Sequence, residues 1–253
     1  MKLTQEQVER IRSGSAAMDA GRELSETCYR IILDNGWYKL FVPEELGGTM
    51  TPLPEAARLI EEASWADGNF GWAIAIGAGG GYFAAYMQPA FARQVFAPLN
   101  GLIAGSGKAG TARKTAGGYE VSGFWKYCSG SLRATVFTAN CRVEGSEEIV
   151  AVAMMPEQVT IVKDWESVGL RATESHSIRA ERAFVPEERT FRLTELVQYG
   201  KYPIYRFPFL QFAEACFAPV ALGLGRHFLE EAGAVLRANR GLNPLFPPEH
   251  EAY

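Results

Sequence analysis

Residues that build metal centres and disulfide frameworks are scarce in this sequence. It has three histidines and four cysteines in 253 residues, and no two cysteines form a C-x-x-C pair. Metal ligands recur at short fixed spacings, and disulfide scaffolds are short chains dense in cysteine. We therefore expect no metal site. The cysteines should be reduced and mostly buried thiols: Cys28, Cys128, Cys141 and Cys216.

Neither sign of charge dominates, and no block of basic residues occurs. The chain has 25 Lys and Arg against 29 Asp and Glu, for a formal net charge of -4. Nucleic acids and anionic membrane surfaces are bound mainly through clustered Lys and Arg. We therefore expect no nucleic-acid or membrane partner, and small molecules are the favoured ligands.

The sequence also lacks an apolar run suited to a bilayer. Residues 68–92 carry no charge, but their strictly apolar part is shorter than the roughly 20 residues that a spanning helix needs. Its glycines permit close packing, so the segment is predicted to be one buried core helix. Because the N-terminus turns polar at once, no secretory signal is expected, and the predicted location is the cytoplasm.

Several motifs of common enzyme classes are missing or lie in the wrong context. The sequence has no H-E-x-x-H and no G-x-S-x-G, which disfavours metal-dependent and serine hydrolases. Residues 105–110 match G-x-G-x-x-G, but a dinucleotide loop must open a helix. Here residues 111–121 lead through Gly117-Gly118 toward another strand, so a Rossmann fold is not indicated.

The chain reads as helices, then strands, then helices. A capping box at Thr4 and Gln7, a stop at Asn35-Gly36 and a start at Pro54 mark early helices. Short alternating runs begin after Gly101. We predict an α+β fold with an N-terminal α-helical domain (1–98), a middle antiparallel β-barrel or sandwich (99–192) and the start of a C-terminal helical bundle (193–253). The predicted strands are 102–106, 119–122, 134–143, 149–154, 159–162 and 177–185.

A last helix is predicted over residues 208–239, before residues 241–249 break the helical pattern with prolines. Its apolar residues recur at helical spacing. They are Phe212, Cys216, Val220, Leu224 and Phe228.

Six short segments, in this order along the chain, share one resemblance. Each is a weak signal alone, but together they resemble the acyl-CoA dehydrogenase superfamily, including its flavin-dependent monooxygenase branch. The segments are D-N-G-W (34–37), V-P-E-E-L-G-G (42–48), W-A-D-G-N-F-G-W (65–72), S-G-F-W-K-Y-C-S-G (122–130), W-E-S-V-G-L-R-A-T-E-S (165–175) and F-V-P-E-E-R (184–189).

The resemblance implies a flavin, FAD or FMN, bound at the middle domain. It puts Ser129 near flavin N5, makes Trp125 and Tyr127 part of the wall beside the ring, and brings the strand of Gly105 and Ser106 against it. Within the segment 165–175, Arg171 and Ser175 are candidate substrate contacts.

Three functions stay open. One is dehydrogenation of an acyl-CoA, which needs a carboxylate base. The resemblance implies that this base lies beyond Tyr253 in many members and near Glu214 in a minority, and Glu214 is about one residue out of register. Because the family's T-E-P motif is absent, the second is hydroxylation of a small organic substrate with reduced flavin and oxygen. The third is a catalytically inactive remnant that serves as a binding module.

The resemblance further implies a flavin reductase or an electron-transfer flavoprotein as partner, and a homo-oligomer. It implies that the C-terminal bundle is cut short in this chain. The apolar stripe of the last helix would then self-associate or dock against the core helix of residues 72–87, and flavin binding would be weak.

Overall fold

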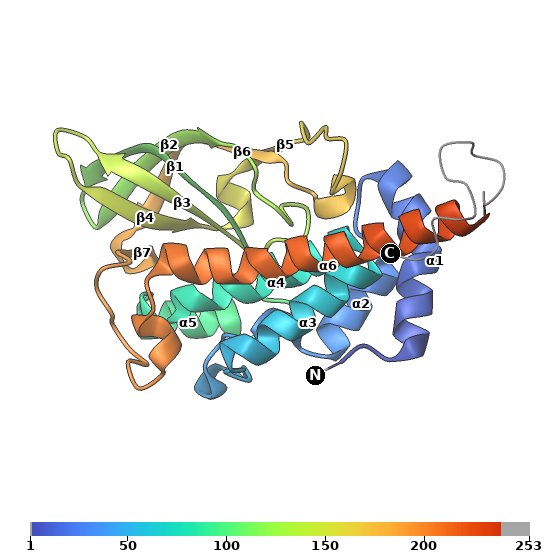
Figure 1. Ribbon diagram of the computed structural model, residues 1–253. Coiled ribbons are helices and arrows are strands. Elements are labelled where there is room, and N and C mark those ends of the chain that lie inside the picture. The colour runs from blue at the N-terminus through green and yellow to red at the C-terminus, as the bar shows by residue number, and fades with distance from the viewer. Residues whose placement is uncertain (1, 239–253) are drawn as a thin grey trace.

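The computed structural model describes residues 2–238 and consists of a twisted sheet packed on a layer of helices (Figure 1). The helices are α1 (Gln5–Gly21), α2 (Glu26–Asp34), α3 (Leu53–Ala66), α4 (Gly68–Gly79), α5 (Pro89–Phe96) and α6 (Phe209–Ala238). The strands are β1 (Ile103–Thr115), β2 (Gly118–Trp125), β3 (Val136–Val143), β4 (Ile149–Met154), β5 (Thr160–Val162), β6 (Ser177–Pro186) and β7 (Thr190–Phe191).

The early helix boundaries follow the predicted signals. At the start of α1, the Thr4 hydroxyl accepts from Gln7 N (3.2 Å) and Gln7 Oε1 accepts from Thr4 N (2.9 Å), which is the predicted capping box. Helix α2 ends at Asp34 and is capped by Asn35, and Gly36 follows with φ of 65°, a conformation that glycine adopts without strain. Helix α3 carries Pro54 in its first turn.

The prediction of one core helix over residues 68–92 is wrong in extent. Helix α4 ends at Gly79, a 3-10 helix follows over Gly80–Ala85, and α5 begins at Pro89. Glycine packing explains the burial, because a Cβ on Gly77 would lie 2.1 Å from the Tyr38 ring. Among the described helices, none is long and apolar enough to cross a membrane.

The seven strands form one sheet in the order β5-β6-β2-β1-β3-β4-β7. The expectation of a purely antiparallel sheet is wrong at one pair, because β1 and β3 run parallel. Strand β2 pairs antiparallel with one edge of β1, and the chain then crosses through residues 126–135 to the other edge. The glycine-rich residues 105–110 lie within β1 and a hairpin follows, which confirms that they are no dinucleotide loop.

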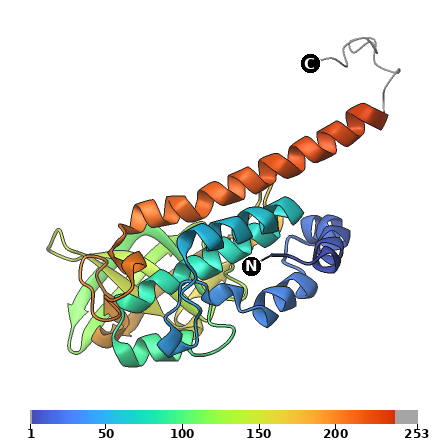
Figure 2. The same cartoon turned by 60° about the horizontal axis from the view of Figure 1, so that its bottom comes forward.

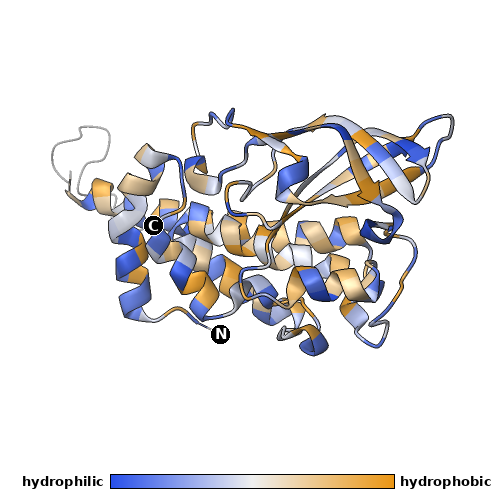
Figure 3. Cartoon of the chain, turned by 180° about the vertical axis from the view of Figure 1, so that it is seen from behind, coloured by the Kyte–Doolittle hydropathy of each residue, from blue (hydrophilic) through white to orange (hydrophobic). Residues whose placement is uncertain are grey.

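The sheet has two distinct faces. Along β3, Phe137, Ala139 and Cys141 enter a core that lies within the sheet, whereas Thr138 and Asn140 point the other way, toward the helices. A second core fills the space among the helices. Figure 3 shows largely hydrophobic helices beneath the sheet and a mostly hydrophilic helix beside the N-terminus. All four cysteines are free and buried, as predicted.

Helix α6 lies along α3 and α4, and its last turns extend past them (Figure 2). The inner residues of the predicted stripe, Phe212, Cys216 and Val220, are buried, while Phe228 is 69% exposed. Gly223 makes the close approach possible, because a Cβ there would lie 2.2 Å from Glu61 O. Docking against the region of residues 72–87 is observed where Phe212 meets Tyr82, whereas the main neighbour of α6 is α3. The predicted break at residues 241–249 lies outside the described residues.

Candidate active site

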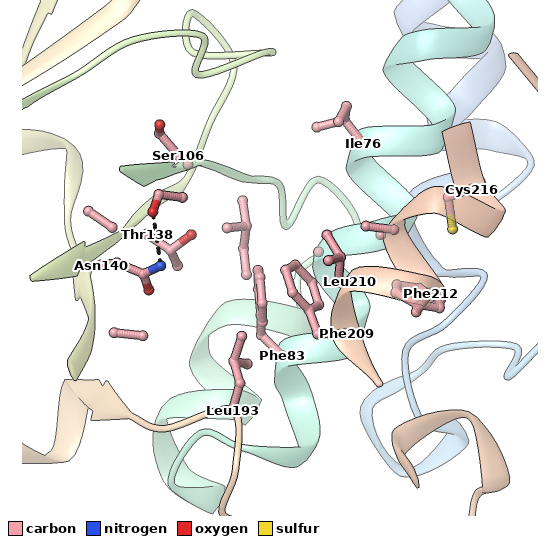
Figure 4. A pocket seen from close by; sticks show the side chains of 18 of the residues that line it. Ile76, Phe83, Ser106, Thr138, Asn140, Leu193, Phe209, Leu210, Phe212 and Cys216 are labelled. Carbon is pink, nitrogen blue, oxygen red and sulfur yellow. Dashed lines mark hydrogen bonds between the residues drawn. The ribbon is translucent and has the colours of Figure 1, made fainter. Parts of the chain in front are cut away.

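A cavity of about 360 Å³ lies between the sheet and the helices (Figure 4). Its sheet wall comes from β1, β3, β4 and β7, and its helix wall comes from α4, the following 3-10 helix and α6. The lining is almost entirely apolar. Ser106, Thr138 and Asn140 are its polar side chains, and the main apolar ones are Ile76, Phe83, Ile103, Phe191, Leu193, Phe209, Leu210, Phe212, Cys216 and Phe217.

An irregularity in β1 shapes the polar end of the cavity. The pairing of β1 with β3 shifts between Ser106 and Ala109, so that two residues of β1 have no partner on β3. Asn140 Nδ2 donates to Gly107 O (3.2 Å) and thereby ties this bulge to β3. Position 105 requires a glycine because a Cβ there would lie only 2.4 Å from Thr138 Oγ1. The bulge turns the backbone of β1 toward the cavity.

Aromatic packing holds the helix wall in place. Phe212 stacks on Tyr82 with a centroid distance of 4.8 Å and meets Phe41 edge-on at 5.1 Å. The segment before α6 is fixed by Tyr205, whose hydroxyl donates to Phe41 O (2.9 Å) and whose carbonyl accepts from Tyr86 (2.8 Å). The cavity therefore has a rigid aromatic side opposite the sheet.

The cavity is electrically neutral. Within residues 2–238, no Asp, Glu, Lys, Arg or His lines it. Burial raises the pKa of the Cys216 thiol to about 12, so this residue is also uncharged at neutral pH. The site can enclose an apolar molecule and offer it a few hydrogen bonds, but it supplies no ionised acid or base.

A second, much smaller cavity of about 20 Å³ lies beside Ser129. Ile76 lines both cavities, so they adjoin at α4. Ser129 is buried, and its hydroxyl accepts from Trp72 Nε1 (2.9 Å) and lies 2.7 Å from Ser175 Oγ. Trp72 in turn stacks on Phe217 of the large cavity, at 5.1 Å and 27° between the planes.

Glu174 also lines the small cavity and is buried. Its Oε1 accepts from Leu24 N (3.1 Å) and from Arg133 Nε (3.3 Å), while Oε2 has no hydrogen-bond partner among the described residues. Burial raises the pKa of this carboxyl, and the Arg133 guanidinium opposes the rise. Its φ of 53° is also unusual for a residue with a side chain.

The predicted cofactor residues divide between these places. Gly105 and Ser106 line the large cavity, and Ser129 lines the small one. Trp125 does not form a wall of either cavity; it is fully buried in the sheet core and its indole N–H donates to Asn140 O (3.4 Å). Strand β2 ends at Trp125, so Tyr127 leaves the strand alternation on which the wall prediction rested. It is 68% exposed.

The predicted substrate and catalytic residues lie in three different places. Ser175 is buried and joins the Ser129 cluster. Arg171 lines neither cavity and pairs with Asp19 on α1 (3.5 Å). Glu214 is exposed on α6 and lines neither cavity, because its side of the helix is opposite to that of Phe212 and Cys216.

Sequence reasoning missed Thr138, Asn140 and Trp72. The first two had a signal, since polar residues at alternate positions of an otherwise apolar strand mark one face for a partner other than the core. Trp72 stands at the end of one quoted motif, but nothing in the sequence indicated its contact with Ser129, 57 residues away.

No protein-family model matches the chain. An indole-3-acetate monooxygenase of Pseudomonas putida is 29% identical over 231 residues, which are 88% of this chain and 58% of that protein. The chain spans between 51% and 58% of the length of the curated relatives that it matches.

Solved structures share the fold. The 3-HSA hydroxylase of Rhodococcus sp. RHA1 superposes with a TM-score of 0.84 at 21% identity, covering 91% of this chain and 65% of that chain. XiaF from Streptomyces sp., in complex with FADH2 and glycerol, superposes with a TM-score of 0.80 at 24% identity, covering 94% and 65%. At identities below 25%, these likenesses show a shared fold.

Proposed function

We propose that this chain forms the flavin- and substrate-binding part of a monooxygenase that hydroxylates a small neutral organic molecule with reduced flavin and dioxygen. The observation that carries the proposal is the apolar cavity of about 360 Å³, which no ionisable side chain except the Cys216 thiol lines within residues 2–238. Ligand sites of this kind are apolar with a few placed polar groups. The sequence relative named a monooxygenase and the neighbour that holds FADH2 support it.

The residues present fit a flavin ring. A flat tricyclic ring needs a smooth wall, and four glycines, Gly79, Gly80, Gly105 and Gly107, line the cavity. A Cβ added to Gly79 or Gly107 would have nothing within 4 Å of it, so a side chain there would occupy open space beside the wall. The ring also needs polar partners at one edge. Ser106 lines the large cavity and Ser129 lines the small cavity that adjoins it, and these are the partners we propose. FAD and FMN share this ring, and the proposal covers both.

When bound, reduced flavin supplies two electrons for the overall reaction, in which one oxygen atom of O2 enters the substrate and the other leaves as water. The protein's part is to exclude bulk water and orient the substrate. The aromatic wall of Phe83, Phe209 and Phe212 serves the first task. Asn140 and Thr138, at the opposite wall, can orient a hydroxyl or N–H of the substrate (Figure 4).

Acyl-CoA dehydrogenation has less support. It requires a carboxylate within hydrogen-bond reach of the carbon that loses a proton. Glu214 is exposed and lines neither cavity, and no other carboxyl of residues 2–238 lines the large one. The binding-module alternative has no observation of its own in its favour.

The lack of charged side chains in the cavity lining also limits the charge of the proposed substrate. A carboxylate buried in this cavity would have no cationic partner among residues 2–238, and burying an unpaired charge costs several kcal/mol. We propose a neutral aromatic compound with one hydrogen-bonding group, such as an indole or a phenol. The reduced flavin would come from a separate flavin reductase, and we propose that the protein is a homo-oligomer.

The test supplies chemically reduced flavin to the protein, adds oxygen, and compares indole with indole-3-acetate. Incorporation of isotopically labelled oxygen into indole, with little or none into the acetate, is the expected result. Rapid oxidation of an acyl-CoA with bleaching of bound flavin would restore the dehydrogenase. Absence of flavin binding would contradict the proposal in every form.

A further inference from the structure

Ser129 belongs to a chain of four hydrogen bonds that runs through the loops beside the small cavity. Trp72 Nε1 donates to Ser129 Oγ (2.9 Å), and Ser129 Oγ lies 2.7 Å from Ser175 Oγ. Ser175 Oγ lies 2.7 Å from Thr173 Oγ1, which donates to Leu170 O (2.9 Å). The three hydroxyl residues are buried, with 5% to 7% of their surface exposed.

The two ends of this chain set the direction of every bond in it. An indole N–H can only donate, and a carbonyl oxygen can only accept. Because Thr173 gives its single hydroxyl hydrogen to Leu170 O, the hydrogen between Thr173 and Ser175 must come from Ser175. The hydrogen between Ser175 and Ser129 must then come from Ser129. The four contacts share four hydrogens, one from the Trp72 indole and one from each hydroxyl, so this is the one assignment in which every contact is a hydrogen bond.

Ser129 is consequently left as an acceptor. Its hydrogen is committed to Ser175, one lone pair receives the Trp72 N–H, and one lone pair remains. To donate to a ligand, Ser129 would have to turn its hydrogen away from Ser175. Ser175 and Thr173 would then reverse, and the bond from Thr173 Oγ1 to Leu170 O would be lost, so that the reversal costs one hydrogen bond.

We propose that Ser175 and Thr173 are positioning residues that hold the Ser129 hydroxyl as an acceptor, so that the site favours a flavin whose N5 carries a hydrogen. Reduced flavin has this N–H, whereas N5 of oxidised flavin is itself an acceptor and would face the lone pair of Ser129. The inference rests on the proposed flavin function and assigns the redox preference of that site to residues that do not touch the flavin.

Thr173→Val tests the inference, because it removes the hydroxyl and keeps the shape. Leu170 O keeps a partner in Trp165 Nε1 (3.0 Å), so the variant should fold. Without Thr173 Oγ1, Ser175 can donate to Ser129, and Ser129 is then free either to accept from the N5–H of reduced flavin or to donate to N5 of oxidised flavin. Thr173→Ser, which retains the hydroxyl, is the matched control.

The measurement is the dissociation constant of reduced and of oxidised flavin, under anaerobic conditions, for the native protein and both variants. We expect the native preference for reduced flavin to fall about tenfold in Thr173→Val, the value of one hydrogen bond, and to persist in Thr173→Ser. By linkage, the midpoint potential of the bound flavin should fall by about 30 mV in Thr173→Val.

The outcomes separate this inference from the function on which it rests. An unchanged preference in Thr173→Val, in a protein that binds flavin, would overturn the role of the hydroxyl chain and leave the proposed function standing. If the native protein binds neither form, the proposed function fails, and the inference fails with it.

Discussion

The two cavities adjoin at Ile76, yet different interactions hold them. Packed aromatic side chains and the backbone of glycines shape the large cavity, and its polar side chains are few. Directed hydrogen bonds between loops 46 residues apart shape the small one. The first depends on volume and tolerates an approximate fit, whereas the second depends on the position of single hydrogens. The large cavity and the small cavity beside Ser129 are thus stabilised by different kinds of interaction, although they adjoin.

The largest expected effect tests the aromatic wall. Phe212→Ala removes a ring that is 1% exposed and contacts both Tyr82 and Phe41. The cavity it leaves should cost about 3–5 kcal/mol of unfolding free energy, measured by chemical denaturation. Phe228→Ala, on the same helix but 69% exposed, should change stability by about 0.5 kcal/mol or less. Equal losses in both variants would contradict the packing of α6 described above.

A smaller effect distinguishes two glycines of the sheet wall. A Cβ on Gly105 would lie 2.4 Å from Thr138 Oγ1 and 2.5 Å from Thr138 O. We expect Gly105→Ala to lose about 1–3 kcal/mol because β1 and β3 must separate. At Gly107 nothing lies within 4 Å, so Gly107→Ala should leave stability nearly unchanged and weaken flavin binding instead. A stable Gly105→Ala variant with native flavin affinity would refute this account of the wall.

The smallest effect concerns the small cavity and appears as a pH dependence. Burial raises the pKa of Glu174 above its ordinary value of 4.5, against the opposing Arg133 and with a further rise from Glu23. The folded state therefore holds this proton more tightly than the unfolded state. Its contribution to stability is complete below pH of about 4.5 and is lost as the pH rises through the folded pKa.

Glu174→Gln removes this titration and keeps the size of the side chain. The variant should lack that part of the decline in stability with rising pH, as measured by denaturation at several pH values. The neighbouring Glu23→Gln variant keeps Glu174 and should retain most of the decline, because burial is the largest cause of the raised pKa of Glu174. Parallel curves for native protein and Glu174→Gln would show that the carboxyl is ionised without penalty.

Local signals predicted the helices well and the site only in part. The caps at Thr4 and Asn35 act within one turn of chain, so the sequence contains all that they need. Strand alternation gives two faces without saying which one meets the helices, and Trp125 lies on the face that enters the sheet core. Tyr127 follows the end of β2 by two residues, in the segment that crosses over β1, so strand alternation does not orient it, and its contact with a flavin stays a prediction.

The sequence by itself determined the order of helices and strands, the buried thiols and the resemblance to a flavin-binding superfamily, because these depend on residue pattern along short stretches. The tertiary structure alone decided that β3 runs parallel to β1, that α6 covers the sheet cavity, and that Trp72, Ser129, Ser175 and Thr173 share one directed chain. Each of these joins residues distant in sequence. Their pairing depends on how whole elements pack, which no local pattern encodes.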